Sequence, residues 1–376
     1  MKDMNILITM KLSNRNLRTH MYPLSTLDEV NRIFIVRDTP GPHIDKVEYY
    51  CPPTWFLKVS PVAFVIKFLL MMFISFKYKP KLILGYLLFP HGVLAFTVGI
   101  LTRTKTGVNL IAGPVDIFSI GSPIERFAYT RQLPGMTTYG RIMMSIMKRM
   151  DIIIANGSFT KLFLTKEGIQ DKKIHILYKP MEIEFDQTNP SKEIEILFLG
   201  RLAKVKHVET VIRTAGYVKN EIPDIKVAIV GDGPEHANLV DLANSLNLSN
   251  TVTFYGWQDN PLEWINDSKI SILTSEREGF PQTVMQSLYL GVPVVSSMCG
   301  DVMDIVKTGY NGILIQDHND SKSFATSIIW LLQHPDDLEK YSENAVKSVK
   351  DRDLLSEAQN TWYTIIHGMK DTCANS

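Results

Sequence analysis

Residues 269–297 read KISILTSEREGFPQTVMQSLYLGVPVVSS, and they contain a complete strand, loop, helix and strand. The apolar runs 269–274 and 292–296 predict two buried strands, because they lack the alternation of a half-exposed strand. Between them, Pro281 suits the first turn of a helix and Gly291 suits its C-terminal cap. A buried strand followed by a helix and another buried strand is the unit that builds parallel sheets.

The same alternation extends along the whole chain. We expect six strands in the first half, at 5–10, 32–37, 81–89, 107–112, 151–155 and 173–178, and six in the second, at 194–200, 225–231, 251–255, 269–274, 292–296 and 312–315. Strands that alternate with helical patterns over 376 residues predict the α/β class with two Rossmann-like domains. We place the first domain at 1–188, the second at 189–353 and a C-terminal helix at 354–376.

Composition and charge restrict the class of protein. An apolar content of 45% and a charged content of 21% are ordinary for a globular protein. Three distant cysteines favour a reducing compartment over a disulfide framework, and no signal peptide is expected. Residues 1–190 hold 24 basic and 14 acidic residues, a net charge of +10, whereas the remainder holds 16 and 25, a net charge of −9. This asymmetry predicts that the first half meets an anionic partner.

The segment 61–81, PVAFVIKFLLMMFISFKYKPK, is the most apolar part of the chain. It is shorter than the roughly 20 apolar residues that span a membrane. It is therefore either a helix packed on the sheet or a helix lying in a membrane interface, with lysines at the headgroups. No acidic residue occurs between Glu48 and Asp116. This absence favours peripheral membrane contact through 55–81 and the basic stretch 126–149.

Glycine-rich or charged segments follow four of the strands expected in the second half. They are GRLAKVK (200–206), VGDGP (230–234), SEREGF (275–280) and SSMCGD (296–301). The carboxyl ends of parallel strands meet at one edge of a sheet, where ligands bind. Two cations, several glycines and the N-termini of helices favour an anion there. The sequence therefore predicts a diphosphate site, although each segment alone could be an ordinary turn.

As an ordered set, these segments and GYNGILI (309–315) resemble the donor half of the retaining glycosyltransferases of the GT-B fold, family 4, also called group 1. The resemblance is dense over 194–315. It is weaker in the first half, where KLILGYLLFPHGVLAF, NLIAGPVD and RMDIIIANGSFTKLFL follow the order of the family's acceptor domain. It implies two Rossmann-like domains that face each other across a cleft, with the C-terminal helix returning to the first domain.

The resemblance also implies roles for individual residues. Arg201 and Lys206 would neutralise the diphosphate of a nucleotide sugar, and Glu278 would accept hydrogen bonds from hydroxyls of the donor sugar. The remaining donor-binding positions are Gly200, Gly231 and Gly233 in the strand-end turns, Gly279, Phe280 and Pro281 beside the sugar, Gln286 at the ribose, and Gly300 near the phosphates. Fixed cations stabilise the charge of the leaving diphosphate, so we expect no metal requirement.

The chain departs from the family pattern at two of these places. Gln286 stands where the family usually has a second Glu, and an amide offers one acceptor oxygen and two donors instead of a carboxylate. Many relatives have a His before the Gly in the segment that matches IAGPVD, and here that position is Ala112, followed by Gly113 and Asp116. His91 either supplies an imidazole from a neighbouring strand end or caps the following helix.

Two further charged segments have open interpretations. Arg15 and Arg18, after the first strand, either hold an acceptor phosphate or are ordinary surface residues. The DxD sequence at 351–353 is expected in a charged C-terminal helix, as solvated surface and not as a metal site.

Three function classes remain at this stage. The first is a metal-independent glycosyltransferase that uses a nucleotide sugar and a glycan or lipid-linked acceptor, with no nucleic-acid partner, at the cytoplasmic face of the cell membrane. The second is a pseudo-glycosyltransferase that serves as a binding or partner subunit, because of Gln286 and Ala112. The third is another GT-B enzyme, such as a nucleotide-sugar epimerase. Arg201, Lys206 and Glu278 favour the first class over the second, and the basic, apolar first half favours it over the third.

Overall fold

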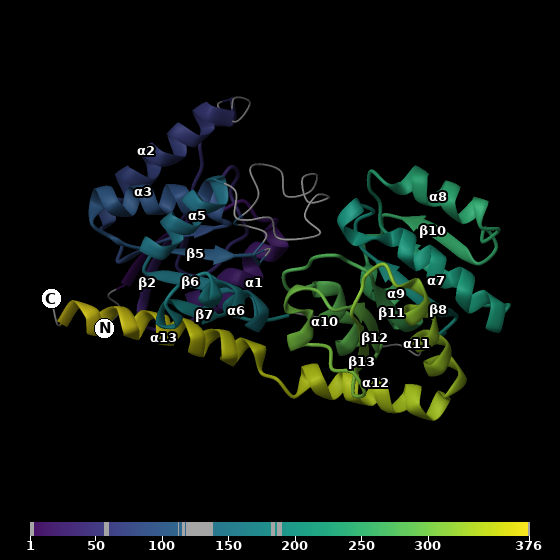
Figure 1. The fold of residues 1–376 in the computed structure, drawn as a ribbon. Coiled ribbons are helices and arrows are strands. Elements are labelled where there is room, and N and C mark those ends of the chain that lie inside the picture. The colour runs from purple at the N-terminus through teal and green to yellow at the C-terminus, as the bar shows by residue number, and fades with distance from the viewer. Residues whose placement is uncertain are drawn as a thin grey trace. The chain divides into compact units, whose positions relative to one another are not determined.

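The computed structural model describes residues 4–55, 60–111, 113–114, 117, 138–181, 185 and 190–374. The chain divides into two compact units, each built around one parallel sheet (Figure 1). The first unit comprises residues 1–123, 130–182 and 353–376, and the second comprises 124–129 and 183–352. The predicted α/β class with two Rossmann-like domains is therefore confirmed.

Within the described residues, the first unit has seven parallel strands in the order β3-β2-β1-β4-β5-β6-β7. The strands are β1 Met4–Thr9, β2 Val30–Val36, β3 Val47–Tyr50, β4 Leu82–Tyr86, β5 Lys105–Leu110, β6 Ile152–Ala155 and β7 Ile174–Ile176. The strand order reverses between β1 and β4, which is the place where ligands bind in sheets of this type.

Helices cover both faces of this sheet. They are α1 Asn14–Ser25, α2 Ser60–Tyr78, α3 Val93–Thr102, α5 Thr138–Arg149, α6 Ser158–Lys166 and α13 Leu354–Ala374. Buried side chains of α1 and α13 form one core with β1, β2, β4 and β6, and those of α2 and α3 form another with β1, β2 and β4. Trp362 of α13 is fully buried in the first of these cores. Figure 1 shows α2 and α3 on one side of the strands and α13 on the other.

The described part of the second unit has six parallel strands in the order β10-β9-β8-β11-β12-β13, which reverses between β8 and β11. The strands are β8 Ile194–Leu199, β9 Val227–Val230, β10 Val252–Gly256, β11 Ser268–Leu273, β12 Val294–Ser297 and β13 Gly312–Ile315. The helices are α7 Val208–Glu221, α8 His236–Ser245, α9 Pro261–Asn266, α10 Gln282–Tyr289, α11 Ser321–Gln333 and α12 Pro335–Lys350. Helices α7, α8 and α11 share the largest core with the sheet, and α9 packs on a separate apolar cluster.

The structure departs from the sequence-based expectations in three places. Strand β3 was missed, because its four half-buried residues, VEYY, carry little of the apolar signal of an inner strand. The strand expected to reach residue 89 ends at Tyr86, and the chain turns into a short π-helix at Leu88–Gly92. Residues 351–353 lie between α12 and α13 and not within a helix, because the carboxylate of Asp353 accepts a hydrogen bond from the backbone N–H of Ser356 at 3.0 Å and caps α13.

Helix α2 packs on the sheet with one face and exposes apolar side chains on the other. Met71 and Ile74 are fully buried against the sheet, so α2 is a helix of the domain. Its outer face, however, exposes Leu69 (58%), Phe73 (52%) and Phe76 (66%). Among the described residues, α2 is the one helix that is long and apolar enough to span a membrane by length and composition, with a mean hydropathy of 1.7 over Pro61–Tyr78.

Candidate functional site

Loops that follow β9, β8, β11 and β12 lie side by side at the carboxyl edge of the second sheet, because these four strands are neighbours. They contain most of the residues singled out in the second half of the sequence. Hydrogen bonds and close backbone contacts join each loop to the next, so the candidate residues form one continuous rim across the point where the strand order reverses.

The glycines after β9 allow the backbone to lie against the loop after β8. Gly231 has a φ of +132°, and a Cβ atom there would lie 1.9 Å from the carbonyl oxygen of Gly200. A Cβ atom on Gly233 would lie 2.3 Å from the carbonyl oxygen of Leu202. These glycines therefore allow two loops to touch each other, in addition to any approach to a ligand.

The loops after β8 and β11 are joined by backbone and side-chain contacts. The N–H of Glu276 donates to the carbonyl of Val205 at 3.0 Å, and the hydroxyl of Thr274 donates to the carbonyl of Lys206 at 2.8 Å. Above these contacts, the Lys206 ammonium pairs with the Glu278 carboxylate at 2.5 Å. The Ser275 hydroxyl donates to the same carboxylate oxygen at 2.7 Å. Lys206 and Glu278, predicted as separate ligand contacts, thus bind each other.

The loop after β12 lies on the backbone of the Glu278 loop. Gly300 has a φ of +52°, and a Cβ atom there would lie 1.9 Å from the carbonyl oxygen of Glu278. The N–H of Asp301 donates to the carbonyl of Gly279 at 3.3 Å, and the Ser297 hydroxyl donates to the carbonyl of Ser275 at 2.6 Å. The position of Glu278 is therefore fixed from both neighbouring strands.

The charges of the rim are unequally neutralised. Arg201 is exposed and has no ion-pair partner among the residues that the structure describes, whereas Lys206 has Glu278. Burial alone lowers the pKa of His207, but the carboxylates of Glu209 and Glu276 outweigh it and raise that pKa above its ordinary value. Burial, and then the charge of Glu278, raise the pKa of the Cys299 thiol to about 12. Cys299 is therefore a protonated thiol and a poor nucleophile at neutral pH.

Helix α10 begins directly after the Glu278 loop and carries the altered family position. Phe280 and Pro281 are buried at its start, and Gln286 is 7% exposed within it. Most of the Gln286 side chain is thus enclosed by protein in this ligand-free structure. The departure from a second Glu removes a charge from a largely buried position, where an unpaired carboxylate would be costly.

The candidate residues of the first half lie in the first unit. His91 is 2% exposed, and its Nδ1 lies 2.8 Å from the Thr9 hydroxyl, at the carboxyl ends of β1 and β4. It does not cap α3, which has no side-chain cap. Burial, and then Lys67, lower the pKa of His91 to about 3, so the imidazole is neutral. Gly113 is a buried turn residue with a φ of +69°, and Ala112 and Asp116 lie outside the described residues.

Two residues of the rim were not predicted as site residues from the sequence. Thr274 and Ser275 are fully buried, and they hold the backbone of Lys206 and the carboxylate of Glu278, respectively. The sequence feature that could have indicated them is a pair of hydroxyl residues, Thr274 and Ser275, at the end of a buried strand. In the described part of the chain, no group of three or more His, Cys, Asp or Glu side chains is placed to hold a metal ion.

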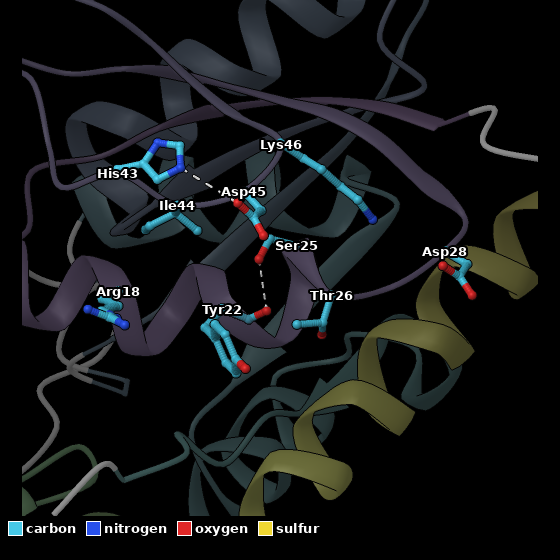
Figure 2. Close-up of a pocket in the computed structure, with 9 residues that line it drawn as sticks. All are labelled: Arg18, Tyr22, Ser25, Thr26, Asp28, His43, Ile44, Asp45 and Lys46. Atoms are coloured by element: carbon cyan, nitrogen blue, oxygen red, sulfur yellow. Dashed lines mark hydrogen bonds and ion pairs between the residues drawn. The ribbon is translucent and has the colours of Figure 1, made fainter. Parts of the chain in front are cut away.

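A separate pocket of about 470 Å³ lies in the first unit between α1 and the chain that leads into β3 (Figure 2). Arg18 and Tyr22 of α1 line it together with His43, Asp45 and Lys46. Figure 2 shows Arg18 on α1 beside Tyr22, with His43, Ile44 and Asp45 on the facing segment. The charges that line the pocket have both signs, so Arg18 does not belong to a purely cationic site. The side chain of Arg15 lies outside the described residues.

The close approach at Gly300 predicts an effect on stability. Gly309→Ala is the matched control, because Gly309 also has a positive φ, +82°, but nothing lies within 4 Å of its Cβ position. Gly309→Ala should lower the free energy of unfolding by about 1–2 kcal/mol, the cost of the left-handed backbone. Gly300→Ala should lower it by about 1–3 kcal/mol more, since the loop must move. Urea denaturation measures both values, and equal losses would contradict the predicted clash.

Comparisons with known proteins were made for the whole chain. Residues 181–348 match the family model of the glycosyl transferases group 1. The chain is 24% identical over 205 residues to N-acetyl-alpha-D-glucosaminyl L-malate synthase of Bacillus anthracis, covering 54% of this chain and 53% of that protein. It is 28% identical over 177 residues to lipopolysaccharide 1,6-galactosyltransferase of Escherichia coli, covering 44% and 48%. The chain thus spans about half the length of the curated relatives it matches.

Solved structures resemble the chain over nearly its full length. The crystal structure of Anabaena HepE in complex with UDP-glucose has a TM-score of 0.76, with 18% identity, and covers 97% of this chain and 100% of that one. The lipopolysaccharide outer core galactosyltransferase WaaB has a TM-score of 0.70, with 16% identity, and covers 96% and 99%. The predicted GT-B fold is therefore confirmed. The match of residues 181–348 and the named relatives confirm the resemblance that the motifs indicated: the second half of the chain is similar to the glycosyl transferases of group 1.

Proposed function

We propose that this protein transfers a sugar from a nucleotide diphosphate sugar to a glycan or lipid-linked acceptor, with retention of the anomeric configuration and without a metal ion. The observation that carries this proposal is the rim of the second sheet, where an exposed Arg201 lies in the same group of loops as the Lys206–Glu278 pair. All three residues fall within the segment that matches the family model.

The rim has the charges that the reaction needs. Cleavage of a sugar–phosphate bond develops positive charge at the sugar carbon and negative charge on the leaving diphosphate. Arg201 can bind phosphate oxygens without losing a partner, and Lys206 can add a second positive charge. Cations held in place before the reaction stabilise the leaving group without reorganisation. This is the basis for proposing a metal-independent reaction.

Lys206 and Glu278 must exchange partners for this reaction to occur. In the ligand-free protein, the two groups neutralise each other at 2.5 Å, with side chains 24% and 13% exposed. A diphosphate would draw the ammonium away from the carboxylate. Glu278 would then be available to accept hydrogen bonds from the donor sugar, while Ser275 continues to hold one of its oxygens. The ion pair thus keeps both groups ordered until the donor binds.

The names of similar proteins fit this proposal. They include a lipopolysaccharide galactosyltransferase and a glucosaminyl malate synthase, and the HepE structure holds UDP-glucose. These names support a role in glycoconjugate or surface polysaccharide synthesis, and they make UDP the first nucleotide to test. The acceptors differ among these proteins, so the names do not select the acceptor.

A pseudo-glycosyltransferase is the second candidate function, because Gln286 replaces the usual second carboxylate. An amide can still donate to or accept from a ribose hydroxyl, with one acceptor oxygen in place of two. A subunit without catalysis would be expected to lose the cations and Glu278 as well, and the chain keeps them. We therefore place the active enzyme first.

Helix α2 supports the proposed contact with the cytoplasmic face of a membrane. Its exposed side chains Val65, Leu69, Phe73 and Phe76 lie three or four residues apart, which places them on one face. Ile100 and Leu101, at the end of the neighbouring α3, are also more than half exposed. An amphipathic helix with basic residues nearby lies in the plane of an anionic membrane. In the second predicted region, residues 126–137 lie outside the described residues, and α5 exposes Arg141, Ile142, Lys148 and Arg149.

The first test is thermal stability with UDP, GDP, ADP and dTDP and with their sugars, with and without magnesium. A nucleotide at about 100 times its Kd should add roughly 2.7 kcal/mol to the free energy of unfolding. One nucleotide should raise the Tm of the wild type independently of magnesium and leave Arg201→Ala unchanged. If no nucleotide raises the Tm, the proposed donor site is contradicted and the pseudo-glycosyltransferase becomes the favoured function.

Loss of the Lys206–Glu278 ion pair should strengthen nucleotide binding and weaken sugar transfer. Glu278→Gln frees Lys206 from its partner, so nucleoside diphosphate should bind about threefold to tenfold more tightly. Sugar transfer should fall by about a hundredfold or more, because the carboxylate that holds the donor sugar is gone. Calorimetric titration and a transfer assay measure the two effects. Glu276→Gln removes a charge in the same loop but leaves the Lys206–Glu278 pair intact, and it should not tighten nucleotide binding.

Membrane contact predicts a loss of vesicle binding when α2 becomes charged. The double variant Leu69→Glu and Phe73→Glu should bind phosphatidylcholine–phosphatidylglycerol vesicles at least about tenfold more weakly, since two apolar side chains no longer enter the interface. Leu162→Glu on α6, where Leu162 is 54% exposed, is the matched control and should bind as the wild type does. Sedimentation with vesicles measures the binding. Equal binding of all variants would exclude α2 as the contact.

A further inference from the structure

Three cations gather at the carboxyl edge of the first sheet, where its strand order reverses. Lys11 follows β1, Arg37 follows β2, and Lys67 of α2 is buried and pairs with Asp38, the residue after Arg37. Arg37 is 6% exposed and Lys67 is 8% exposed, so two of the three positive charges are buried. Lys11 is exposed to solvent.

Among the described residues, the carboxylate that pairs with these cations is that of Asp38. Lys67 Nζ lies 2.5 Å from Asp38 Oδ1, with side chains 10% and 29% exposed. The Arg37 guanidinium donates to the Asn14 amide oxygen at 3.2 Å and to the carbonyl of Leu12 at 2.9 Å, and both acceptors are neutral. Among the described residues, neither Arg37 nor Lys11 forms an ion pair. The cluster therefore carries two positive charges in excess.

The pKa values of His91 and Cys51 respond to charges of this cluster, because both side chains lie close to it. Burial lowers the pKa of His91, and Lys67 and Lys11 lower it further, while Asp38 opposes them. Burial raises the pKa of the Cys51 thiol, and Arg37, Asp38 and Lys67 all act on it. His91 is neutral, so it adds no charge to the cluster, and its contact with the Thr9 hydroxyl orients the ring at 2.8 Å.

A buried guanidinium without a carboxylate is costly, because water no longer solvates the charge. An anion that enters the cluster offsets this cost. A phosphate group suits the site better than a carboxylate, since it carries up to two charges and accepts several hydrogen bonds from a guanidinium and ammonium groups. Helix α1 begins at the same edge with no acidic residue in its first turn, and its N-terminus also favours an anion.

We propose that Lys11, Arg37 and Lys67 bind a phosphate group of the acceptor at the carboxyl edge of the first sheet. This inference rests on the proposed function, because only a transferase has an acceptor, and it narrows the acceptor to a phosphorylated molecule. Lys67 lies on the inner face of α2, whose outer face is apolar and exposed. The phosphate can belong to a lipid headgroup that reaches the cluster beside α2 or to a soluble phosphomonoester.

The site differs from the one that the sequence suggested for an acceptor phosphate. Arg18 lines the pocket of Figure 2 together with Asp45 and Lys46. The strands and α2 bring Lys11, Arg37 and Lys67 together although they are far apart in the sequence.

The test uses the full chain with saturating nucleoside diphosphate, so that the Arg201 site is occupied. Glycerol 3-phosphate and dihexanoyl phosphatidic acid, the latter kept below its micelle concentration, are titrated separately by calorimetry. Saturable binding of either probe is expected, and it should weaken about tenfold in Lys11→Gln and in Lys67→Met, which each remove one charged contact. Asp38→Asn removes the carboxylate that pairs with Lys67 and should tighten binding. Lys166→Gln, an exposed lysine of α6, is the matched control and should bind as the wild type does.

The two probes distinguish the source of the phosphate. Equal affinities indicate a soluble phosphomonoester, and tighter binding of the phosphatidic acid indicates a lipid. The proposal is overturned if the wild type shows no saturable binding, or if Lys11→Gln and Asp38→Asn both bind as the wild type does. Lys11 is exposed and Asp38 is partly so, which keeps the test valid if Lys67→Met fails to fold.

Nucleotide binding is measured on the same samples to separate this inference from the proposed function. Nucleotide binding without binding of either phosphate probe overturns the acceptor site alone. Binding of the probes without nucleotide binding overturns the proposed donor chemistry and leaves a phosphate site on the first unit.

Discussion

Close backbone packing between neighbouring loops is the constraint on which the candidate donor site depends. Gly231 lies against the carbonyl of Gly200, and Gly300 lies against the carbonyl of Glu278, each at a distance that excludes a Cβ atom. Parallel strands place these loops side by side, but only glycine lets them touch. Because the loops touch, Thr274, Ser275 and the backbone of the Glu278 loop hold Lys206 and Glu278 in one network. A looser rim would leave two charged side chains free to move independently.

Both sheets have charged side chains at the edge where their strand order reverses. The two edges differ in how far carboxylates neutralise the positive charges. In the second unit, Glu278 neutralises Lys206 directly, so the proposed donor would have to compete with a carboxylate for this second cation. In the first unit, Asp38 pairs with Lys67, and Arg37 forms no ion pair within the described part of the chain but donates to the neutral oxygen atoms of Asn14 and Leu12. The first arrangement suits a ligand that is bound and released in each cycle. The arrangement in the first unit leaves an excess of positive charge, which favours the binding of an anion.

Helix α2 connects the first of these edges to the exposed apolar face. Its inner side packs Met71 and Ile74 on the sheet and presents Lys67 to Asp38, while its outer side presents Leu69, Phe73 and Phe76. A single helix therefore faces both a charged cluster and a potential membrane contact. A lipid that carries a phosphate would match both sides, which relates the proposed membrane contact to the proposed acceptor chemistry.

The sequence by itself determined the α/β class, the strands of both sheets except β3, and the loops that carry the candidate donor residues. These features follow from local signals, namely apolar runs, helical periodicity and glycines at strand ends. Only the tertiary structure decided that Lys206 pairs with Glu278, that most of Gln286 is enclosed within its unit, and that Lys11, Arg37 and Lys67 share one edge. Ion pairing and burial depend on which elements meet in space, and partners such as Lys206 and Glu278 are 72 residues apart in the chain. The exposed face of α2 was undecided for the same reason, since its apolar residues have the same composition whether they meet a sheet or solvent.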